Sequence, residues 1–142
     1  MFRNFLVFVL LALSLVLNSN AHVPITTFDS ACFEEAGISE HEFEKRIPTL
    51  LADLDSMSDK ESCYFSCIGK KSGEILDDGI LDLDGFRTRA FDMTDEQYLF
   101  LKNCTEQTEV NPCQATKKSI LCVKQLIAQL ETEYAATASE AS

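Results

Sequence analysis

The segment that follows Asn111 has the clearest periodic arrangement of apolar and polar residues in the chain. From Cys113 onward, apolar side chains recur at every third or fourth position, with lysines and glutamines between them. Asn111 and Pro112 stand in the order favoured for a capping side chain and a first-turn proline. The pattern therefore predicts an amphipathic helix that begins at Pro112 and extends to Glu133.

Short helices are predicted in the preceding part of the chain from their start signals. In a capping box, a Ser or Thr side chain and a Glu or Gln side chain three residues later satisfy exposed N–H groups at the start of a helix. The sequence contains three such pairs: Ser39 with Glu42, Ser58 with Glu61, and Thr94 with Gln97. The alternation typical of strands is scarce. We therefore expect an all-α fold, a compact single domain of about six short helices.

Glycine and proline mark where the first helices are expected to end. A helix that begins at Thr27 stops at Gly37. The helix after Ser39 is expected to fail near Pro48, because proline restricts the preceding residue and has no backbone N–H to donate. A separate short turn is then predicted over residues 50–54.

The middle of the chain is expected to hold two further helices joined by a turn. The first covers residues 59–71 and ends at Gly73. The Asp-Asp-Gly sequence of residues 77–79 then supplies a turn. A short helix over residues 86–91 follows it.

Residues 1–21 have the composition of a cleavable secretion signal. Arg3 precedes an apolar run over residues 5–17, and a polar stretch ends at Ala21, where cleavage is expected. The apolar run is shorter than the roughly 20 residues that span a bilayer. The mature protein is therefore expected to be a secreted, extracellular domain over residues 22–142.

The mature chain is strongly acidic. Without Arg3, 11 basic residues stand against 23 acidic ones, a formal charge of −12. This charge repels nucleic acid and anionic membrane surfaces, so neither is expected as a partner. Residues 135–142 are small and polar without apolar periodicity, and we expect them to form a flexible tail.

Six cysteines form the most informative motif of the sequence. Gaps of 30, 3, 36, 8 and 8 residues separate them: Cys32, Cys63, Cys67, Cys104, Cys113 and Cys122. An even number of cysteines in a small secreted chain indicates three disulfides, and spacing alone leaves 15 pairings open. Cys63 and Cys67 lie one turn apart on a predicted helix, where they are badly placed to bond to each other. That helix is expected to hold two bridges to other elements.

The last helix presents its two cysteines on opposite sides. Cys113 and Cys122 are nine residues apart, which places them about 180° apart around the helix axis. The apolar arc of the helix lies between them, and Lys117 and Lys124 occupy the other side, where Leu121 is the apolar exception. We expect two neighbouring elements to fix this helix over an apolar core or cavity.

The cysteine spacing resembles that of the insect odorant-binding proteins of the pheromone-binding and general odorant-binding type. The resemblance rests on the gaps of three and eight residues in an acidic, helical, secreted chain, and it covers residues 32–122. It implies three disulfides around an apolar cavity, pairing Cys32 with Cys67, Cys63 with Cys113, and Cys104 with Cys122. The function it implies is that of a carrier that moves small hydrophobic ligands, such as odorants or pheromones, through aqueous extracellular fluid.

Candidate ligand-contacting residues follow from helical facing. The apolar candidates are Leu50, Leu54, Phe65, Ile68, Leu76, Phe91, Leu99, Val123 and Ile127. The candidates for a hydrogen bond to the polar end of a ligand are Ser66, Tyr98, Thr116 and Tyr134. A small hydrophobic molecule is the expected partner, and the resemblance adds a membrane chemoreceptor as a candidate.

Enzymatic functions have little support in the sequence. The cysteines are expected to be paired, and neither a Gly-x-Ser-x-Gly motif nor a glycine-rich phosphate loop occurs. His22 and His41 are the only histidines, so a metal site is not indicated. We expect no catalytic residues, no cofactor and no bound metal.

Two alternative functions remain open on the same fold. One is a non-olfactory scavenger of small molecules, which the tissue of expression would separate from an olfactory carrier. The other is a secreted interaction or inhibitor protein with a filled interior, which would not take up an apolar fluorescent probe.

Overall fold

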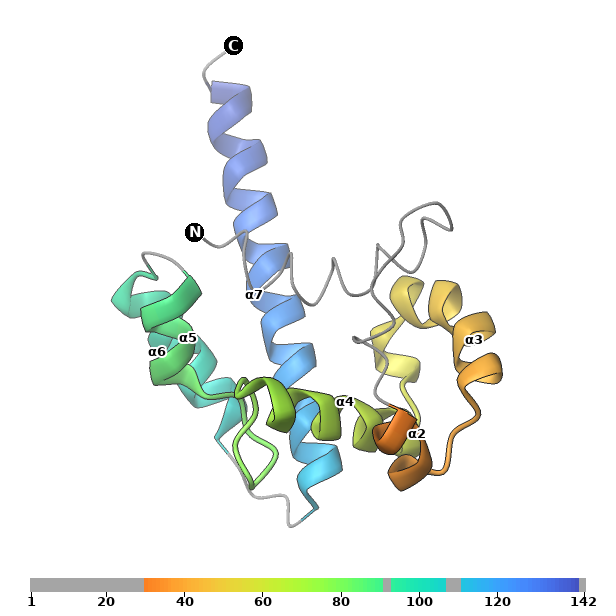
Figure 1. Cartoon of the computed structure of the whole chain (residues 1–142). Coiled ribbons are helices and arrows are strands. Elements are labelled where there is room, and N and C mark those ends of the chain that lie inside the picture. Colours follow the sequence, from red (N-terminus) through yellow and green to blue (C-terminus); the bar gives the residue numbers. More distant parts are fainter. Residues whose placement is uncertain (1–29, 91–92, 107–110, 141–142) are drawn as a thin grey trace.

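The computed structural model of the chain describes residues 30–90, 93–106 and 111–140, and its helices are labelled in Figure 1. Within these ranges the helices are α2 (Ser30–Ala36), α3 (Glu40–Ala52), the 3₁₀ helix η2 (Leu54–Ser56), α4 (Asp59–Ser72), α5 (Leu83–Ala90), α6 (Asp95–Thr105) and α7 (Pro112–Glu140). The described residues contain no β-sheet beyond an isolated bridge between Ile75 and Leu81. The predicted all-α class is confirmed.

Two of the predicted capping boxes are complete. At the start of α4, Ser58 N donates to Glu61 Oε1 (2.8 Å) and Glu61 N donates to Ser58 Oγ (3.1 Å). Thr94 and Gln97 make the same reciprocal pair at α6. At α3 the Ser39 hydroxyl accepts from Glu42 N (3.4 Å). The helix start signals in the sequence therefore set the observed starts of α3, α4 and α6.

The prediction that Pro48 would end the second helix is wrong. Helix α3 continues through Pro48 to Ala52, and the turn predicted over residues 50–54 is divided between the end of α3 and η2. Ile47 and Leu50, on either side of Pro48, are 1% and 0% exposed. Burial of two such side chains contributes about 1.5–3 kcal/mol each, which offsets the roughly 3 kcal/mol that an interior proline costs a helix.

The boundaries of two shorter helices differ from the predicted ones by a few residues. Helix α5 begins at Leu83 instead of Phe86, because the Asp82 carboxylate accepts a hydrogen bond from Gly85 N (3.1 Å) and caps an earlier start. Helix α2 ends at Ala36, and Gly37, the predicted stop, follows it with φ of 71°. The predicted start of this helix at Thr27 lies outside the described residues.

Helix α7 is longer than the sequence indicated. It begins at Pro112, with Asn111 Oδ1 accepting from Cys113 N (2.8 Å), as predicted. It ends at Glu140 instead of Glu133, since alanines, the best helix formers, are frequent after Tyr134. Figure 1 shows this end projecting beyond the other helices. The flexibility of residues 135–142 stays a prediction.

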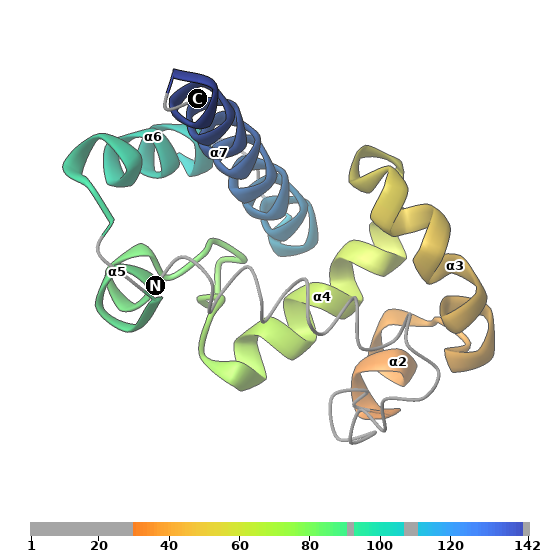
Figure 2. The same ribbon diagram turned by 90° about the horizontal axis from the view of Figure 1, so that it is seen from above.

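The buried apolar side chains of the described residues, apart from Ala115, form two clusters on either side of the place where α4 and α7 meet. The first cluster joins α2, α3 and α4 and contains the buried residues Cys32, Phe33, Phe43, Ile47, Leu50, Met57, Tyr64 and Cys67. The second joins α5, α6, α7 and the loop before α5 and contains Leu81, Phe86, Met93, Leu101, Cys122, Val123 and Leu126. Figure 2 shows α2 and α3 at one end of α4 and α5 at the other.

The three disulfides have the pairing that the resemblance implied. Cys32 is bonded to Cys67, Cys63 to Cys113, and Cys104 to Cys122. Helix α4 therefore holds two bridges, to α2 and to α7. The two cysteines of α7 bond to different elements, α4 and α6, as their positions on opposite sides of the helix required.

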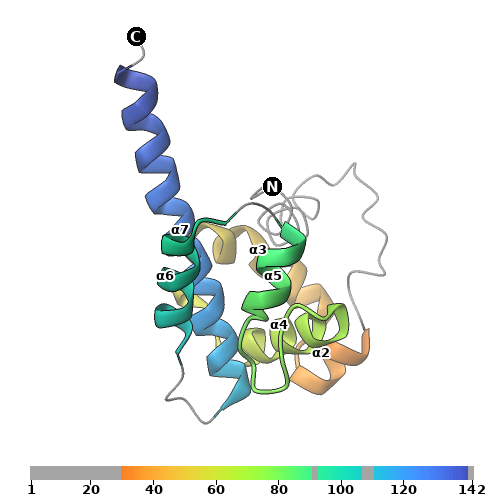
Figure 3. The same cartoon turned by 90° about the vertical axis from the view of Figure 1, so that its left-hand side faces the viewer.

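The loop between α4 and α5 is held on the first turns of α7 (Figure 3). Residues 77–79 form the predicted turn, in which Gly79 N donates to Leu76 O (2.9 Å). Thr116 Oγ1 donates to Gly79 O (2.9 Å), and Leu81 N donates to Ser119 Oγ (3.2 Å). The hydroxyl groups of α7 thus satisfy backbone groups of a loop that is buried against them.

Candidate ligand-binding site

Partly buried apolar side chains from α3, η2, α4 and α7 pack against the first core cluster. Leu51 comes from the end of α3 and Leu54 from η2, Phe65 and Ile68 come from α4, and Ile120 comes from α7. We refer to these five residues as the α3–α4–α7 site. In Figure 1, α3 and α7 both rise from the level of α4. Each of the five retains accessible apolar surface beside a closed core, which makes them candidates for contact with an apolar ligand.

Aromatic stacking fixes the α4 side of this site. The ring of Phe33 stacks on that of Tyr64 with centroids 4.3 Å apart. Phe43 contacts both Tyr64 (4.9 Å) and Phe65 (5.9 Å). Because Phe65 is half-buried while the other rings are closely packed, it is the member of this group that presents a face outside the core.

Polar contacts connect the segment around η2 to α4. Arg46 Nε lies 3.1 Å from Glu61 Oε2, and the other end of the guanidinium donates to Ser56 O (2.9 Å) and Ser56 Oγ (2.8 Å). The Glu61 side chain is 8% exposed. Its charge is compensated by Arg46 and by the Ser58 N–H of the capping box. This network positions Leu54 beside α4.

Two lysines of α7 bind the same segment from the other side. Lys117 Nζ donates to Met57 O (2.8 Å), and Lys124 Nζ lies 3.1 Å from Asp55 Oδ2. Leu121, on the same side of the helix, is half-buried. The side of α7 that the sequence indicated as polar is therefore partly an interface with the η2 segment.

The structure brings some of the predicted ligand-contacting residues together and separates others. Leu54, Phe65 and Ile68 belong to the α3–α4–α7 site. Leu50 and Val123 are buried in the two cores, and Ile127 is a partly buried neighbour of the second. Leu76 and Leu99 are 48% and 52% exposed, away from these clusters. Phe91 lies outside the described residues.

The predicted polar candidates have different environments. Thr116 is 1% exposed, and its hydroxyl is used by Gly79 O and Pro112 O. Ser66 is 3% exposed, and within the described part of the chain its Oγ has no hydrogen-bond partner. Tyr134 is 79% exposed on the projecting end of α7.

Tyr98 belongs to a cluster that joins α5 to α6. Its hydroxyl donates to Asp84 Oδ1 (2.8 Å), and the Arg87 guanidinium lies 4.9 Å from its ring centroid while also pairing with Asp95. The hydrogen bond to Asp84 raises the pKa of Tyr98 above its ordinary value, and desolvation and the Asp84 charge act in the same direction. The Tyr98 hydroxyl, predicted to bind the polar end of a ligand, therefore already donates its hydrogen to Asp84.

Sequence reasoning missed Leu51, Ile120 and Lys117 as site residues. Ile120 stands at the edge of the apolar arc of α7, beside Lys117 and Lys124. Leu51 is three residues before Leu54, a spacing that places both on one side of a helical turn. Lys117 stands at the border of the apolar arc of α7 in the sequence. This position alone does not distinguish a solvated lysine side chain from one at an interface.

The described ranges contain no group of three or more His, Cys, Asp or Glu side chains arranged to hold a metal ion. No helix there combines the length and the hydropathy needed to cross a bilayer.

The fold defines a disulfide-bonded, all-α domain with a candidate apolar site. Residues 17–126 match the model of the PBP/GOBP family. The match covers more than half of the chain, and the chain belongs to this family, which contains the insect pheromone-binding and general odorant-binding proteins. Proteins of the family are secreted carriers that bind small hydrophobic ligands and are not enzymes. Comparison with curated proteins and with solved structures gives no significant match.

Proposed function

We propose that this protein is a secreted carrier that takes up small hydrophobic molecules, such as odorants or pheromones, and moves them through aqueous extracellular fluid. The observation that carries the proposal is that five partly buried apolar side chains pack on the first core cluster: Leu51, Leu54, Phe65, Ile68 and Ile120. The family membership supports the same ligand class.

Burial of apolar surface drives uptake in this proposal. Each Å² of apolar surface removed from water contributes about 25 cal/mol before the cost of ordering the ligand. The half-buried side chains of the α3–α4–α7 site supply such surface on the protein. The disulfides Cys32–Cys67 and Cys63–Cys113 fix α2 and α7 to α4, so the site needs little ordering when a ligand binds.

Secretion is part of the proposal. Residues 1–21 would be removed after Ala21 and the mature chain of residues 22–142 would fold in an oxidising compartment, where its disulfides form. N-terminal sequencing of the protein recovered from the extracellular fluid would test this, with His22 as the expected first residue.

Probe uptake tests the function itself. The mature protein is titrated with N-phenyl-1-naphthylamine, whose fluorescence rises in an apolar environment, and saturable uptake is expected. Phe65→Ala and Ile120→Ala should weaken uptake, whereas Leu99→Ala, at a side chain 52% exposed and outside the site, should leave it unchanged. A folded protein that takes up no probe would contradict the proposal and favour an interaction or inhibitor function.

A mass measurement under native conditions complements the titration. The protein purified from its source without denaturation should carry a bound small molecule, and its own mass should be lower by the six hydrogens lost in forming three disulfides. The mass difference between the native complex and the denatured chain identifies the ligand directly.

A further inference from the structure

Three cations surround the η2 segment, and two of them are paired with carboxylates. Arg46 is paired with Glu61, and Lys124 with Asp55. Among the described residues, the only hydrogen-bond acceptor of the Lys117 ammonium is a neutral group, the carbonyl of Met57. An ammonium group has three N–H donors, so Lys117 retains hydrogen-bonding capacity, and it pairs with no carboxylate in the part of the chain that the structure describes.

Lys117 lies at the border of the α3–α4–α7 site. Met57, whose carbonyl it binds, is 2% exposed and belongs to the first core cluster. Ile120, one turn further along the same side of α7, packs on that cluster. Lys117 itself is half-buried. Its ammonium group is therefore positioned where an apolar site ends, in partial contact with solvent.

We propose that Lys117 binds the carboxylate of an amphipathic ligand, so that the preferred ligands are alkyl carboxylic acids instead of uncharged molecules of the same length. The inference rests on the proposed carrier function and specifies the ligand class of that site. The alkyl chain packs on Ile120 and Phe65, and the carboxylate accepts hydrogen bonds from the Lys117 ammonium. Charge-assisted hydrogen bonds of this kind are stronger than neutral ones.

The acidity of the protein does not oppose this binding. The formal charge of −12 is spread over the whole mature chain, and exposed charges are screened beyond a Debye length of about 8 Å at physiological ionic strength. An ammonium in contact with the ligand acts at a much shorter distance and in a half-buried position, where screening is weaker.

Helix α7 supplies a matched control for this lysine. Lys118 Nζ also donates to a backbone carbonyl, that of Glu106 (3.1 Å), but it lies about 100° further around the helix, on the side of α6. The substitutions Lys117→Met and Lys118→Met therefore remove the same group and the same type of hydrogen bond from two sides of one helix.

The test is competition between N-phenyl-1-naphthylamine and a pair of ligands that differ only in the head group, dodecanoic acid and dodecanol, at neutral pH. We expect Lys117→Met to weaken binding of the acid about 10-fold or more, in line with the strength of a hydrogen bond to a charged group. Binding of the alcohol should change less than about twofold. Lys117→Arg should retain the preference for the acid, and Lys118→Met should behave as the wild type.

The outcomes separate this inference from the function on which it rests. If the wild type takes up neither the probe nor either ligand, the carrier function fails. If it takes up the probe and Lys117→Met lowers the affinities for acid and alcohol by the same factor, or changes neither, the carrier function stands and the role of Lys117 is wrong. Lys117→Gln, which keeps a hydrogen-bond donor to Met57 O, gives the same comparison if the methionine variant does not fold.

Discussion

A Cβ atom added to Gly79 would lie 2.0 Å from the carbonyl oxygen of Pro112, so the loop between α4 and α5 contacts the first turn of α7 backbone to backbone. Gly79 also has φ of 88°, in the left-handed region that other residues rarely adopt. The predicted Asp-Gly turn therefore needs glycine for two reasons: the positive φ of the turn, and the close approach to Pro112, which the sequence of the turn does not indicate.

Gly79→Ala should destabilise the protein by about 3 kcal/mol or more, because the strain of positive φ adds to a clash with backbone atoms that have no room to move. Gly37→Ala is the control: its φ is 71° and an added Cβ meets nothing within 4 Å, so only the conformational cost of about 1–2 kcal/mol is expected. Urea unfolding of both variants measures the difference. Equal losses of unfolding free energy in the two variants would show that the contact with Pro112 relaxes without an energetic penalty.

Arg46→Met should lower the free energy of unfolding by about 2–3 kcal/mol, because it leaves the Glu61 carboxylate buried without its cation. Glu61→Gln should cost less, about 1 kcal/mol, since glutamine retains the capping box at the start of α4. The double variant completes a mutant cycle in which a coupling energy of about 1 kcal/mol or more is expected. Additive effects would mean that the ion pair contributes nothing beyond its separate parts.

Replacement of both Cys63 and Cys113 by serine should lower stability by up to about 4 kcal/mol, since this bridge closes a loop of about 50 residues in the unfolded chain. Replacement of Cys104 and Cys122, which close a loop of about 18 residues, should cost up to about 3 kcal/mol. Probe uptake should be lost only in the first variant, which separates α7 from α4. Retained uptake there would mean that the α3–α4–α7 site does not need this bridge.

The phenol of Tyr98 should titrate above its ordinary pKa of 10.0 in the folded protein, and Asp84→Asn should bring its pKa back toward that value, because the main cause is the hydrogen bond to Asp84. A group whose pKa is raised by folding stabilises the protein below the unfolded pKa. This stabilisation is lost as the pH rises through the folded pKa. Absorbance of tyrosinate during an alkaline titration follows the change, and Tyr98→Phe identifies the group. An unchanged titration in Asp84→Asn would refute this assignment.

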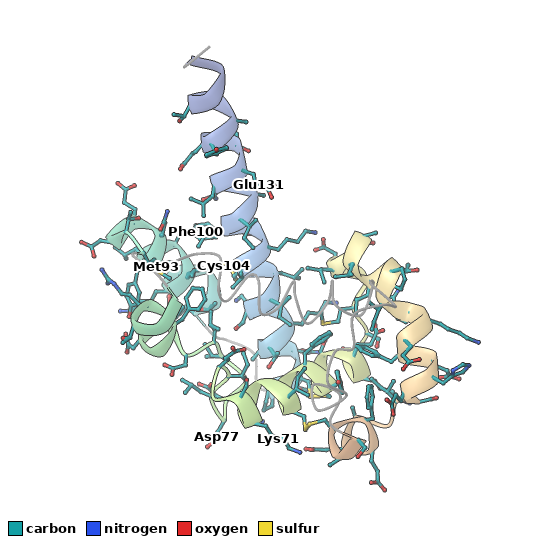
Figure 4. All side chains as sticks on the ribbon, turned by 45° about the horizontal axis from the view of Figure 1, so that its top comes forward. Lys71, Asp77, Met93, Phe100, Cys104 and Glu131 are labelled. Carbon is teal, nitrogen blue, oxygen red and sulfur yellow. A yellow bond between two sulfur atoms is a disulfide. The ribbon has the colours of Figure 1, made fainter. Side chains whose placement is uncertain are left out.

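Deletion of residues 134–142 should change stability by less than about 0.5 kcal/mol and leave probe affinity within about twofold, because Tyr134, the large apolar side chain of this segment, is 79% exposed. Figure 4 shows the end of α7 beyond Glu131 extending away from the labelled residues of α4 and α6. A marked loss of affinity after deletion would indicate that the tail reaches the site in solution.

The sequence predicted the site only in part, and the reasons differ between residues. Phe65 and Ile68 were found because α4 is bounded by strong local signals, so their helical facing was known. Leu76 and Leu99 were chosen by the same criterion but are exposed, since facing on one element does not specify which neighbour, if any, covers it. Lys117 was missed because the carbonyl that it binds, that of Met57, lies 60 residues earlier in the chain. Ile120 was missed because it packs on a core cluster built from α2, α3 and α4.

The sequence by itself determined the features that depend on local chemistry. Short stretches of sequence determine several helix boundaries: the caps at Ser58 and Thr94, the start of α7 at Pro112, and the glycine stops. The cysteine spacing identified the family. Tertiary structure alone decided that α3 passes through Pro48 and that the lysine side of α7 contacts the η2 segment. Both outcomes depend on burial and ion pairing between distant segments, whose energies are comparable to the local preferences that they override.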